Sequence, residues 1–406
     1  MKNAIVAQSG GPTAVINASA IGVISSILES KCYDKIYGGI NGIQGILQKK
    51  IVDLSHLDNK QLERIKYTPS SFLGSCRYKL KDHNEQDEEY LQLFKILDEL
   101  EVQTLFYIGG NDSMDTVSKL SDYVQLKGLD KQIIGIPKTI DNDLCHTDHT
   151  PGYGSTVKYI VTTILETYLD FNAYDNKGIF ILETMGRDTG WLAASGVIAK
   201  INGKAIVDFI YLPEIEFSQK KFLEEIAEKY IEKKIVYIVV SEGIKDKQGR
   251  YFFGSTSTEH DAFSHSQLGG VSKYLKKLIV EKGITTRVKT FELNIAQRCS
   301  MHCVSHRDIE ESYLLGKEAV IYSNDGYTGF MVGIKRKQTE HYEIETFRVE
   351  ASTVANNIKY FPAEWINTSK NNIKKDAIEY ISPLIATSQE LLINNGLPNY
   401  FCFEEK

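Results

Sequence analysis

The segment Pro137–Asp143, "PKTIDND", places Lys138, Thr139, Asp141 and Asp143 within seven residues. Alternating acidic residues form neither a good strand nor a good helix interior, so we expect function rather than packing to keep them here. An ammonium group beside two carboxylates can bind an anion, take up a proton and ligate a hard cation. The segment follows the apolar run "QIIGI" (132–136), which predicts that it lies at the end of a buried strand.

Two more strand ends carry glycine pairs. Gly10 and Gly11 follow "AIVAQ" (4–8), and Gly109 and Gly110 follow "TLFYI" (104–108). Glycine lets the backbone approach an anion, and a helix N-terminus after each pair would present free N–H groups, with Pro12 suited to a first helical turn. Neither loop matches GxxxxGK[ST] or a dinucleotide-binding GxGxxG, which disfavours a nicotinamide dehydrogenase.

Short apolar runs alternate with helical stretches through most of the chain, which predicts an α/β fold with parallel strands covered on both faces. We expect two doubly wound α/β lobes with a cleft between them and a mainly helical C-terminal segment. Residues 318–336, with "SNDG" between apolar runs, favour a hairpin. Residues 79–101 predict a solvated helix with its inward face formed by Leu91, Phe94, Leu97 and Leu100.

Composition narrows the class of protein. The 406 residues suit two domains, and a net charge of −6 argues against general binding to nucleic acid or to a membrane surface. No apolar run reaches the roughly 18 residues that span a bilayer. The apolar stretch at the N-terminus is too short for a signal peptide. Six scattered cysteines without a CxxC pair favour a reducing, cytoplasmic setting.

The segments "GGPTAVINAS", "IGGNDS", "PKTIDND", "ETMGRDTGWLA", "SEG" and "QR" resemble the phosphofructokinase family in order and spacing, over about residues 4–335. The resemblance implies Mg²⁺-dependent phosphoryl transfer to the 1-hydroxyl of fructose 6-phosphate. It also implies a homodimer or homotetramer. For the lobes it implies a phosphoryl-donor lobe (1–152 with 297–335), a sugar-phosphate lobe (153–296 with 336–360) and a helical extension (361–406).

Asp112 and Lys138 stand where ATP-using members of the family typically have glycine. The resemblance is therefore to the pyrophosphate-dependent branch: a carboxylate at 112 repels an ATP α-phosphate, and Lys138 adds a cation beside a donor that is pure charge. Fructose 6-phosphate and pyrophosphate are then the expected small-molecule partners, in a reversible reaction. Two alternatives stay open: an ATP-dependent 6-phosphofructokinase, and a non-catalytic sugar-phosphate sensor, which the presence of Asp141 and Lys138 disfavours.

The resemblance implies a role for each matched residue. Asp141 is the expected general base and Lys138 the cation that stabilises the transition state. Residues expected to bind the donor are Gly10, Gly11, Arg77, Gly109, Gly110, Asp112 and Lys138. Residues expected to bind the sugar phosphate are Thr139, Asp141, Met185, Gly186, Arg187, Glu242, Arg287 and Arg298. Asn111 and Asp143 are the expected metal ligands, although the family usually has an aspartate at the position of Asn111.

A separate cluster, "RCSMHCVSHRD" (298–308), contains Cys299, His302, Cys303 and His306. On a single helix these residues would form one stripe, and both types can bind zinc. One straight helix rarely supplies four tetrahedral ligands, because the stripe does not surround the ion. We therefore expect a partly buried helix here rather than a zinc site.

Overall fold

The computed structural model describes residues 2–252 and 268–401, and these form two compact units. The first unit comprises residues 1–155, 298–358 and 387–406, and the second comprises 156–297 and 359–386. The expected lobe boundaries agree with this division to within three residues up to residue 335 and differ from it after that residue. Residues 336–358 belong to the first unit, and the C-terminal segment is divided between the two units.

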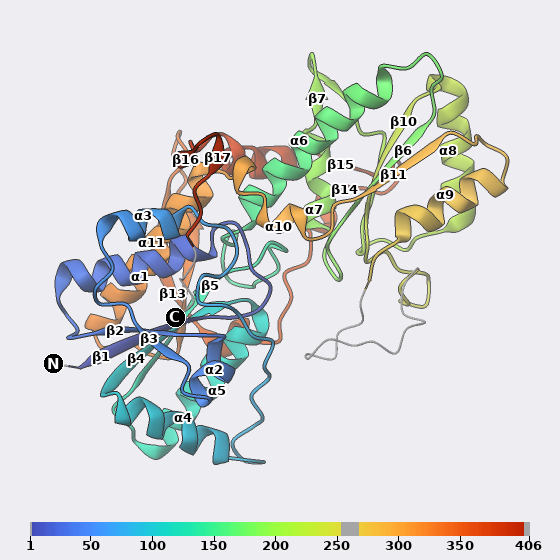
Figure 1. The fold of residues 1–406 in the computed structure, drawn as a ribbon. Coiled ribbons are helices and arrows are strands. Elements are labelled where there is room, and N and C mark those ends of the chain that lie inside the picture. Colours follow the sequence, from blue (N-terminus) through green and yellow to red (C-terminus); the bar gives the residue numbers. More distant parts are fainter. Residues whose placement is uncertain (1, 253–267, 402–406) are drawn as a thin grey trace. The chain divides into compact units, whose positions relative to one another are not determined.

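A seven-stranded sheet forms the centre of the first unit, with strand order β13-β12-β5-β4-β1-β2-β3 (Figure 1). Neighbours from β12 to β2 are parallel, and the two edge strands are antiparallel. The strands are β1 (Asn3–Gln8), β2 (Ile36–Gly39), β3 (Ile51–Asp53), β4 (Val102–Gly109), β5 (Gln132–Pro137), β12 (Phe330–Arg336) and β13 (Ile344–Glu350).

Helices cover both faces of this sheet, as the unbroken apolar strand sequences predict. Ala4 and Val6 of β1 pack with α1 (Ile16–Ser30), α3 (Asn59–Lys66) and α11 (His306–Asn324). Ile5 and Ala7 point to the opposite face, where they pack with α2 (Gly42–Leu47), α4 (Glu88–Glu99), α5 (Asn111–Lys127) and α12 (Ala351–Val354). The predicted doubly wound arrangement is confirmed for this unit.

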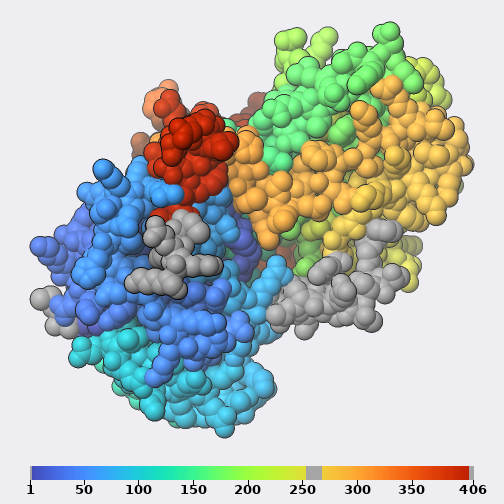
Figure 2. Space-filling view, viewed as in Figure 1, coloured from blue at the N-terminus to red at the C-terminus, as the bar shows by residue number. Residues whose placement is uncertain are grey.

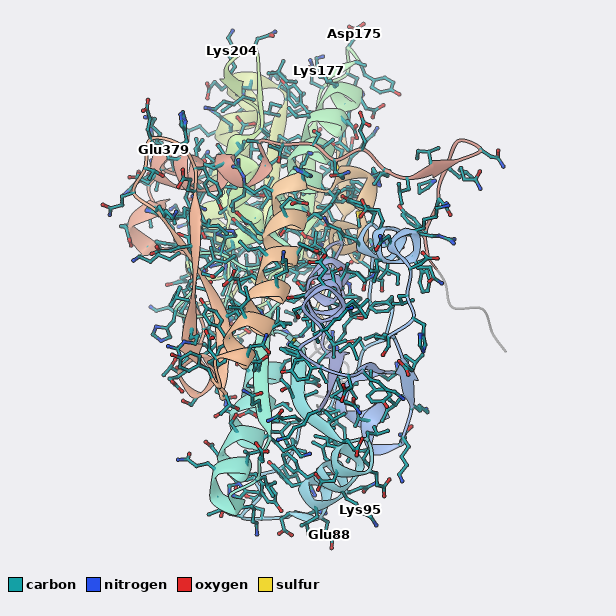
Figure 3. The ribbon with its side chains drawn as sticks, turned by 90° about the vertical axis from the view of Figure 1, so that its left-hand side faces the viewer. Glu88, Lys95, Asp175, Lys177, Lys204 and Glu379 are labelled. Carbon is teal, nitrogen blue, oxygen red and sulfur yellow. The ribbon has the colours of Figure 1, made fainter. Side chains whose placement is uncertain are left out.

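The charged stretch 79–101 forms helix only from Glu88. Its inward face contains Tyr90, Leu93, Phe94, Ile96 and Leu97, while Leu91 is 55% exposed, so the expectation for Leu91 was wrong. Because 3.6 residues complete a turn, Leu91 points away from the side that Tyr90 and Phe94 occupy. Glu88 and Lys95 lie at the outer surface of this helix, as a solvated face requires (Figure 3).

The second unit contains a four-stranded parallel sheet with order β11-β6-β10-β9. Its strands are β6 (Ile179–Thr184), β9 (Phe209–Tyr211), β10 (Val236–Ser241) and β11 (Val288–Glu292). Helices α8 (Gln219–Lys233) and α9 (Val271–Glu281) pack on one face. On the other face α6 (Tyr153–Asn172) packs through Phe171 against Phe180, and α7 (Trp191–Ala194) continues into the 3₁₀ turn η1 (Ser195–Ile198). A short ribbon, β7 (Lys200–Ile201) with β8 (Lys204–Ala205), follows.

Two sequence expectations about the last third of the chain were wrong. Residues 318–324 complete α11, so the hairpin is not at "SNDG" but between β12 and β13. The C-terminal segment has less helix than expected: α13 (Lys375–Ile381) and the turns η3 (Ala363–Trp365) and η4 (Ser382–Ile385) alternate with two-residue strands. These strands pair as β14 (Ile366–Asn367) with β15 (Asn372–Ile373), and β16 (Ile393–Asn394) with β17 (Leu397–Pro398).

The last described residues pack against the N-terminal part of the first unit, where red and blue atoms meet in Figure 2. Arg64 donates to the carbonyl oxygen of Tyr400, and the backbone N–H of Phe401 donates to Thr68 Oγ1 at 2.8 Å. Tyr400 also packs against Ala14, Val15 and Met301. Within the described ranges, the model contains no helix that is both long and apolar enough to cross a bilayer.

Candidate active site

The first unit brings three loops to one edge of its sheet. Strand β1 pairs with β2 on one side and β4 on the other, and the helices that follow β1 and β4 lie on opposite faces. Such a reversal is where open α/β sheets bind ligands, beyond the carboxyl ends of the strands. The register pairs Gln8 with Ile108 and Gly109 with Pro137, so the loops after β1, β4 and β5 are adjacent, as the sequence predicted.

The loop after β1 does not lead directly into a helix. Helix α1 begins at Ile16, so the expectation that Pro12 occupies a first helical turn was wrong. Gly10 has a φ of +74°, its N–H donates to Cys76 O at 3.0 Å, and its carbonyl accepts from Ser75 Oγ at 2.5 Å. These bonds join the loop to the segment that carries Arg77.

Both glycines of this loop face positive side chains. A Cβ at Gly10 would lie 3.1 Å from Lys138 Nζ, and a Cβ at Gly11 would lie 3.1 Å from Arg298 Nη1. Arg298 is 287 residues away from Gly11 in the chain, and no sequence pattern indicated this contact. The sequence analysis expected Arg298 to bind the sugar phosphate, and the structure places its guanidinium next to Gly11, one of the residues expected to bind the donor.

The loop after β4 leads directly into a helix, as predicted. Gly110 is the N-cap of α5, and Asp112 lies in its first turn, where a negative charge also interacts favourably with the helix dipole. Gly109 packs closely: a Cβ there would lie 1.9 Å from Ser113 Oγ. Ser113 Oγ donates to Ser9 Oγ at 3.0 Å, which connects this loop to the loop after β1. Ser9 and Ser113 are contacts that the sequence analysis missed.

Lys138 is the most unusual group at this edge. Its side chain is only 3% exposed, and Nζ donates to Gly11 O at 2.7 Å. Burial lowers the pKa of Lys138 to about 8. The nearby carboxylates of Asp141 and Asp143 act in the opposite direction, while Arg298 and Arg77 lower it further. Burial and the charge of Arg77 also lower the pKa of Arg298. Three cations and two carboxylates therefore influence one another here, which suits a polyanionic ligand.

The loop after β5 has a fixed conformation. Asn142 adopts φ +53°, and its side-chain oxygen accepts from Thr150 N at 3.1 Å. The hydroxyl of Thr150 donates to Thr139 O at 2.9 Å, and the N–H of Asp141 donates to Thr139 Oγ1 at 3.2 Å. The sequence analysis did not single out Asn142, although asparagine is enriched in this left-handed conformation.

The far end of the same loop binds to α11. Asp308 accepts from Gly152 N and Ser155 N, each at 2.9 Å. The His149 ring contacts Asp148 Oδ1 at 2.8 Å and Glu311 Oε2 at 2.6 Å. Burial disfavours the charged ring, but the two carboxylates outweigh it and raise the pKa of His149. The contacts with Asp308 and Glu311 span more than 150 residues of sequence and left no local pattern from which to predict them.

The two expected metal ligands, Asp143 and Asn111, have different surroundings. Asp143, like the expected base Asp141, places a carboxylate close enough to Lys138 to raise the pKa of that lysine. The amide oxygen of Asn111 instead accepts the N–H of Asn356 at 2.6 Å. Within the described residues, no cluster of three or more His, Cys, Asp or Glu could hold a metal. This set fits Mg²⁺ held by one or two carboxylates together with phosphate oxygens, rather than a cage made by the protein alone.

The second unit brings four of the expected sugar-phosphate residues to one sheet edge. Met185, Gly186 and Arg187 follow β6, and Glu242 follows β10, whose Ser241 pairs with Thr184. The N–H of Glu242 donates to Thr184 O at 3.0 Å, and Ser241 Oγ donates to Gly186 O.

Glycines hold this second edge in shape. Gly186 has a φ of +125°, which strongly favours glycine, and a Cβ at Gly243 would lie 1.9 Å from Arg187 O. The N–H of Met185 donates to Gln297 Oε1 at 3.2 Å. The sequence analysis missed Gly243 and Gln297, although both are direct neighbours of motif residues.

Arg287 does not lie with these residues. It directly precedes β11, and Val288 pairs with Ile179 at the start of β6, so Arg287 lies at the opposite, amino-terminal edge of the sheet. Its guanidinium stacks over the rings of Phe171 and Tyr174, at 5.5 and 5.2 Å from their centroids. Arg287 therefore belongs to the same unit as Arg187 and Glu242 but lies at the opposite edge of its sheet.

The four cysteines and histidines of the cluster at 298–308 do not share one helix. Helix α10 (Ala296–Cys299) ends before the turn η2 (Met301–Cys303), and α11 begins at His306. His306 Nδ1 contacts Gln389 Oε1 at 2.6 Å. The expectation of a single helix was wrong, because this short segment turns twice.

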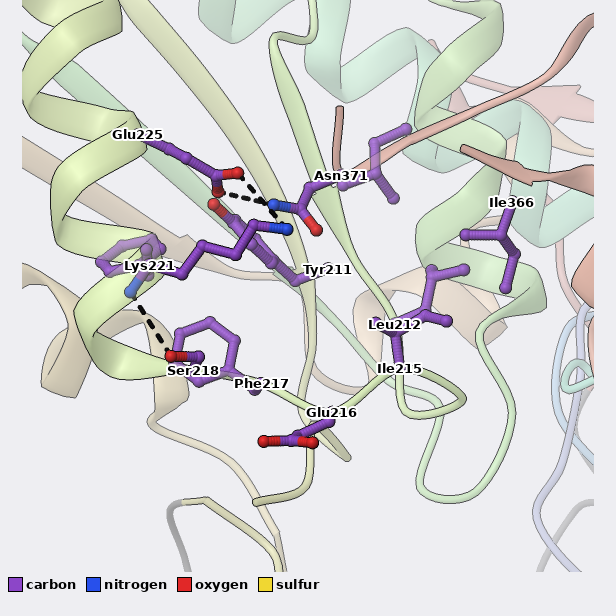
Figure 4. Close-up of a pocket in the computed structure, with 12 residues that line it drawn as sticks. Tyr211, Leu212, Ile215, Glu216, Phe217, Ser218, Lys221, Glu225, Ile366 and Asn371 are labelled. Atoms are coloured by element: carbon purple, nitrogen blue, oxygen red, sulfur yellow. Dashed lines mark hydrogen bonds and ion pairs between the residues drawn. The ribbon is translucent and has the colours of Figure 1, made fainter. Parts of the chain in front are cut away.

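A small cavity in the second unit is lined by the strand end and helix around Tyr211, Lys221 and Glu225 (Figure 4). Glu225 accepts from Asn371 Nδ2 at 2.5 Å and lies 3.6 Å from Lys221 Nζ. The volume of this cavity, about 40 Å³, suits water rather than a sugar phosphate. None of the expected site residues lines it.

Comparison with known proteins adds to this geometry. The phosphofructokinase family model matches residues 3–307. A pyrophosphate–fructose 6-phosphate 1-phosphotransferase of Halomonas elongata is 36% identical over 399 residues, covering 98% of this chain and 94% of that protein. The crystal structure of a pyrophosphate-dependent phosphofructokinase from Nitrosospira multiformis has a TM-score of 0.88 and 34% identity, covering 98% and 96% of the two chains. A sulfofructose kinase of Alkalicoccus urumqiensis is 33% identical over 357 residues, covering 86% and 88%.

Proposed function

The chain belongs to the phosphofructokinase family, and we propose that it transfers a phosphoryl group from pyrophosphate to the 1-hydroxyl of fructose 6-phosphate. The products are fructose 1,6-bisphosphate and phosphate. The observation that carries this proposal is the buried Lys138 beside Gly11 and Arg298, next to a helix whose first turn carries Asp112. The similarity to relatives named for pyrophosphate as donor supports it.

In this reaction the 1-hydroxyl oxygen attacks the terminal phosphorus, the bridging P–O bond breaks, and the leaving phosphate keeps the bonding electrons. Asp141 takes the hydroxyl proton as general base. Lys138, Arg77 and Arg298 stabilise the charge on the transferring and leaving groups, because a preorganised cation loses little energy to reorganisation. Gly10 and Gly11 let the donor approach these cations closely. Mg²⁺, when bound through Asp143 and phosphate oxygens, would neutralise donor charge.

Donor choice follows from the charges near residues 109–113. Asp112 disfavours the additional phosphate of a nucleotide, and Lys138 compensates for the missing adenine contacts with direct attraction to pyrophosphate. At 4 Å this attraction is worth roughly 4 kcal/mol at an effective dielectric of 20, before desolvation. Because transfer from pyrophosphate carries little net free-energy drive, we propose that the reaction runs in both directions near equilibrium.

The sugar phosphate is assigned to Met185, Gly186, Arg187 and Glu242 of the second unit. Glu242 accepts hydroxyl hydrogen bonds, and Arg187 offers a planar fork to an oxyanion. Arg287 lies at the other edge of that sheet, so it would reach a sugar phosphate only in a homo-oligomer, through the site of another copy. The relative named sulfofructose kinase favours one second candidate, a sulfonate-bearing fructose as acceptor.

The test measures initial rates of purified protein with Mg²⁺ and fructose 6-phosphate, with pyrophosphate or ATP as donor. We expect turnover with pyrophosphate and much less with ATP. Sulfofructose in place of fructose 6-phosphate tests the second candidate. Equal rates with both donors would contradict the proposed donor, and no turnover with either would support a sensor instead.

The double variant Asp112→Gly with Lys138→Gly tests the two side chains directly. It should shift preference toward ATP and weaken use of pyrophosphate. If the variant keeps the parental ratio of rates with the two donors, the explanation from these charges is wrong.

A further inference from the structure

The side chain of Asn111 is fully engaged by a turn that follows α12. Its Oδ1 accepts the backbone N–H of Asn356 at 2.6 Å. Its Nδ2 donates to Asn357 O at 2.5 Å and, at 3.4 Å, to Val354 O. All three partners are backbone groups, so the contact depends on the fold of residues 354–357 rather than on their side chains.

These bonds fix the orientation of the amide and the chemical type of the residue. A primary amide has one oxygen that accepts and an NH₂ that donates twice, and the turn offers one N–H and two carbonyls. An aspartate could accept from Asn356 N but could not donate to either carbonyl. The turn therefore matches asparagine at 111 and would repel the carboxylate that the family usually has there.

A second residue of α5 binds the same turn. Asp115, one helical turn after Asn111, accepts from Asn356 Nδ2 at 3.0 Å and pairs with Lys119 at 2.7 Å. Asn356 adopts φ +60°, and its side chain and that of Asn357 are exposed. Val354 and Ala351 are buried with residues of α5 in one apolar cluster. The exposed part of the turn is thus bound to α5 chiefly by hydrogen bonds from positions 111 and 115.

Asn111 stands at the start of α5, next to residues that are expected to bind the donor. It is the first residue of α5, directly between the N-cap Gly110 and Asp112. The 354–357 turn that it binds directly precedes Ile358, the residue after which the chain leaves the first unit. The contact with this turn therefore holds the first residue of α5, which lies beside the N-cap Gly110 and Asp112.

We propose that Asn111 is a positioning residue for the pyrophosphate-binding loop, bound to the 354–357 turn, and not a ligand of the metal. This inference rests on the proposed function for its effect on the donor. The binding of position 111 to the turn does not depend on which reaction the protein catalyses, and it can be tested without turnover. The carboxylate of Asp143 remains the metal ligand among the expected residues.

Asn111→Asp separates the two roles. A metal ligand at 111 would gain charge, so Mn²⁺ affinity, measured by electron paramagnetic resonance of the apoprotein, would rise. If position 111 binds the turn, Mn²⁺ affinity stays within twofold of the parent. Hydrogen exchange of a peptide covering 353–358 instead accelerates at least tenfold, because two donated hydrogen bonds are lost. The KM for pyrophosphate should rise as well.

Asn111→Ala provides the second variant, and Ser352→Ala the control. The alanine at 111 removes the contact without adding charge, so exchange should again accelerate while Mn²⁺ affinity stays constant. Ser352→Ala removes an exposed side chain of α12 just before the turn. Asn357→Ala is unsuitable, because the Asn357 side chain donates to Thr353 O and Ala355 O within the turn. For Ser352→Ala, both measurements should match the parent.

Tighter Mn²⁺ binding by Asn111→Asp, or weaker binding by Asn111→Ala, would overturn the proposal. So would parental exchange rates in both variants. Exchange and Mn²⁺ binding need no turnover, so a failure of the proposed donor would appear in the rate assay alone and would leave these two results to be judged separately.

Discussion

The two units place their candidate residues at the same kind of position, the carboxyl edge of a parallel sheet, but with different groups. In the first unit the edge is defined by charge: Lys138 is buried against Gly11, and Arg298 and Arg77 lie close enough to shift pKa values. In the second unit the edge is defined by backbone shape, with Gly186 at φ +125° and Gly243 packed against Arg187 O.

This difference assigns different work to the two units. Buried charges that influence one another are suited to stabilising a transition state, because their orientation is fixed before the reaction. A closely packed backbone turn instead fixes where one arginine and one glutamate can point, which suits selection of an acceptor. Variants of the first edge should therefore change turnover and donor use, and variants of the second should change affinity for the sugar phosphate.

The largest effect on turnover is expected from the sheet edge of the first unit, which carries Lys138 and Asp141. Asp141→Ser removes the proposed base, so kcat should fall by about 10²–10⁴-fold with little change in either KM. Steady-state kinetics and a thermal melt measure this. Asp175→Ser, an exposed aspartate of the second unit, is the control and should match the parent (Figure 3). A large rise in the KM for fructose 6-phosphate with unchanged kcat would contradict the assignment of chemistry to this edge.

The next largest effect is expected at the sheet edge of the second unit, where Gly186 and Gly243 lie. Gly243→Ala places a Cβ 1.9 Å from Arg187 O, so the turn that carries Arg187 must move. Overpacking of this kind costs about 1–3 kcal/mol, and we expect the KM for the sugar phosphate to rise by a comparable roughly 5- to 150-fold. The KM for pyrophosphate, measured on the same variant, serves as the internal control. An equal rise in both constants would remove the distinction between the two edges.

The pH dependence of donor binding should reflect Lys138. With a pKa of about 8, its ammonium is lost as the pH rises through 8, so the KM for pyrophosphate should increase from there. The effect on stability has the opposite sign. Because the unfolded chain binds this proton more tightly, the contribution of Lys138 to folding rises between about pH 8 and the usual lysine pKa near 10.4.

Lys138→Arg is the control for this prediction. Arginine stays charged throughout the range, so its KM for pyrophosphate, even if higher overall, should show no inflection near pH 8. An inflection that persists in this variant would show that another group titrates.

The smallest effect on donor binding is expected from widening the close contact between Gly11 and Arg298. Gly11→Ala would place a Cβ 3.1 Å from Arg298 Nη1, the movable end of a long side chain, at a φ without strain. We expect donor binding to weaken by about 0.5–1 kcal/mol and the melting temperature to stay constant. An effect as large as that of Gly243→Ala would mean that Arg298 cannot move and that this edge, too, is defined by shape.

Sequence reasoning reached the parts of the site that are local in the chain. The loops after β1, β4 and β5 were found because glycine pairs and "PKTIDND" directly follow apolar runs. It failed where a helix began or ended without an apolar signal, as at Ile16 and at residues 318–324. It did not predict where Arg287 lies, because a motif match gives the type of a residue but not the edge of the sheet on which it lies.

The sequence by itself determined the doubly wound α/β class, the order of the motifs and the charges available at the strand ends, since periodicity and residue type are local properties. Only the tertiary structure decided that Lys138 is buried against Gly11, that Arg298 lies beside Gly11, and that Asn111 binds a turn some 245 residues away. Each depends on which distant segments the sheet order brings together, and pKa values and metal ligation depend on those neighbours rather than on residue type.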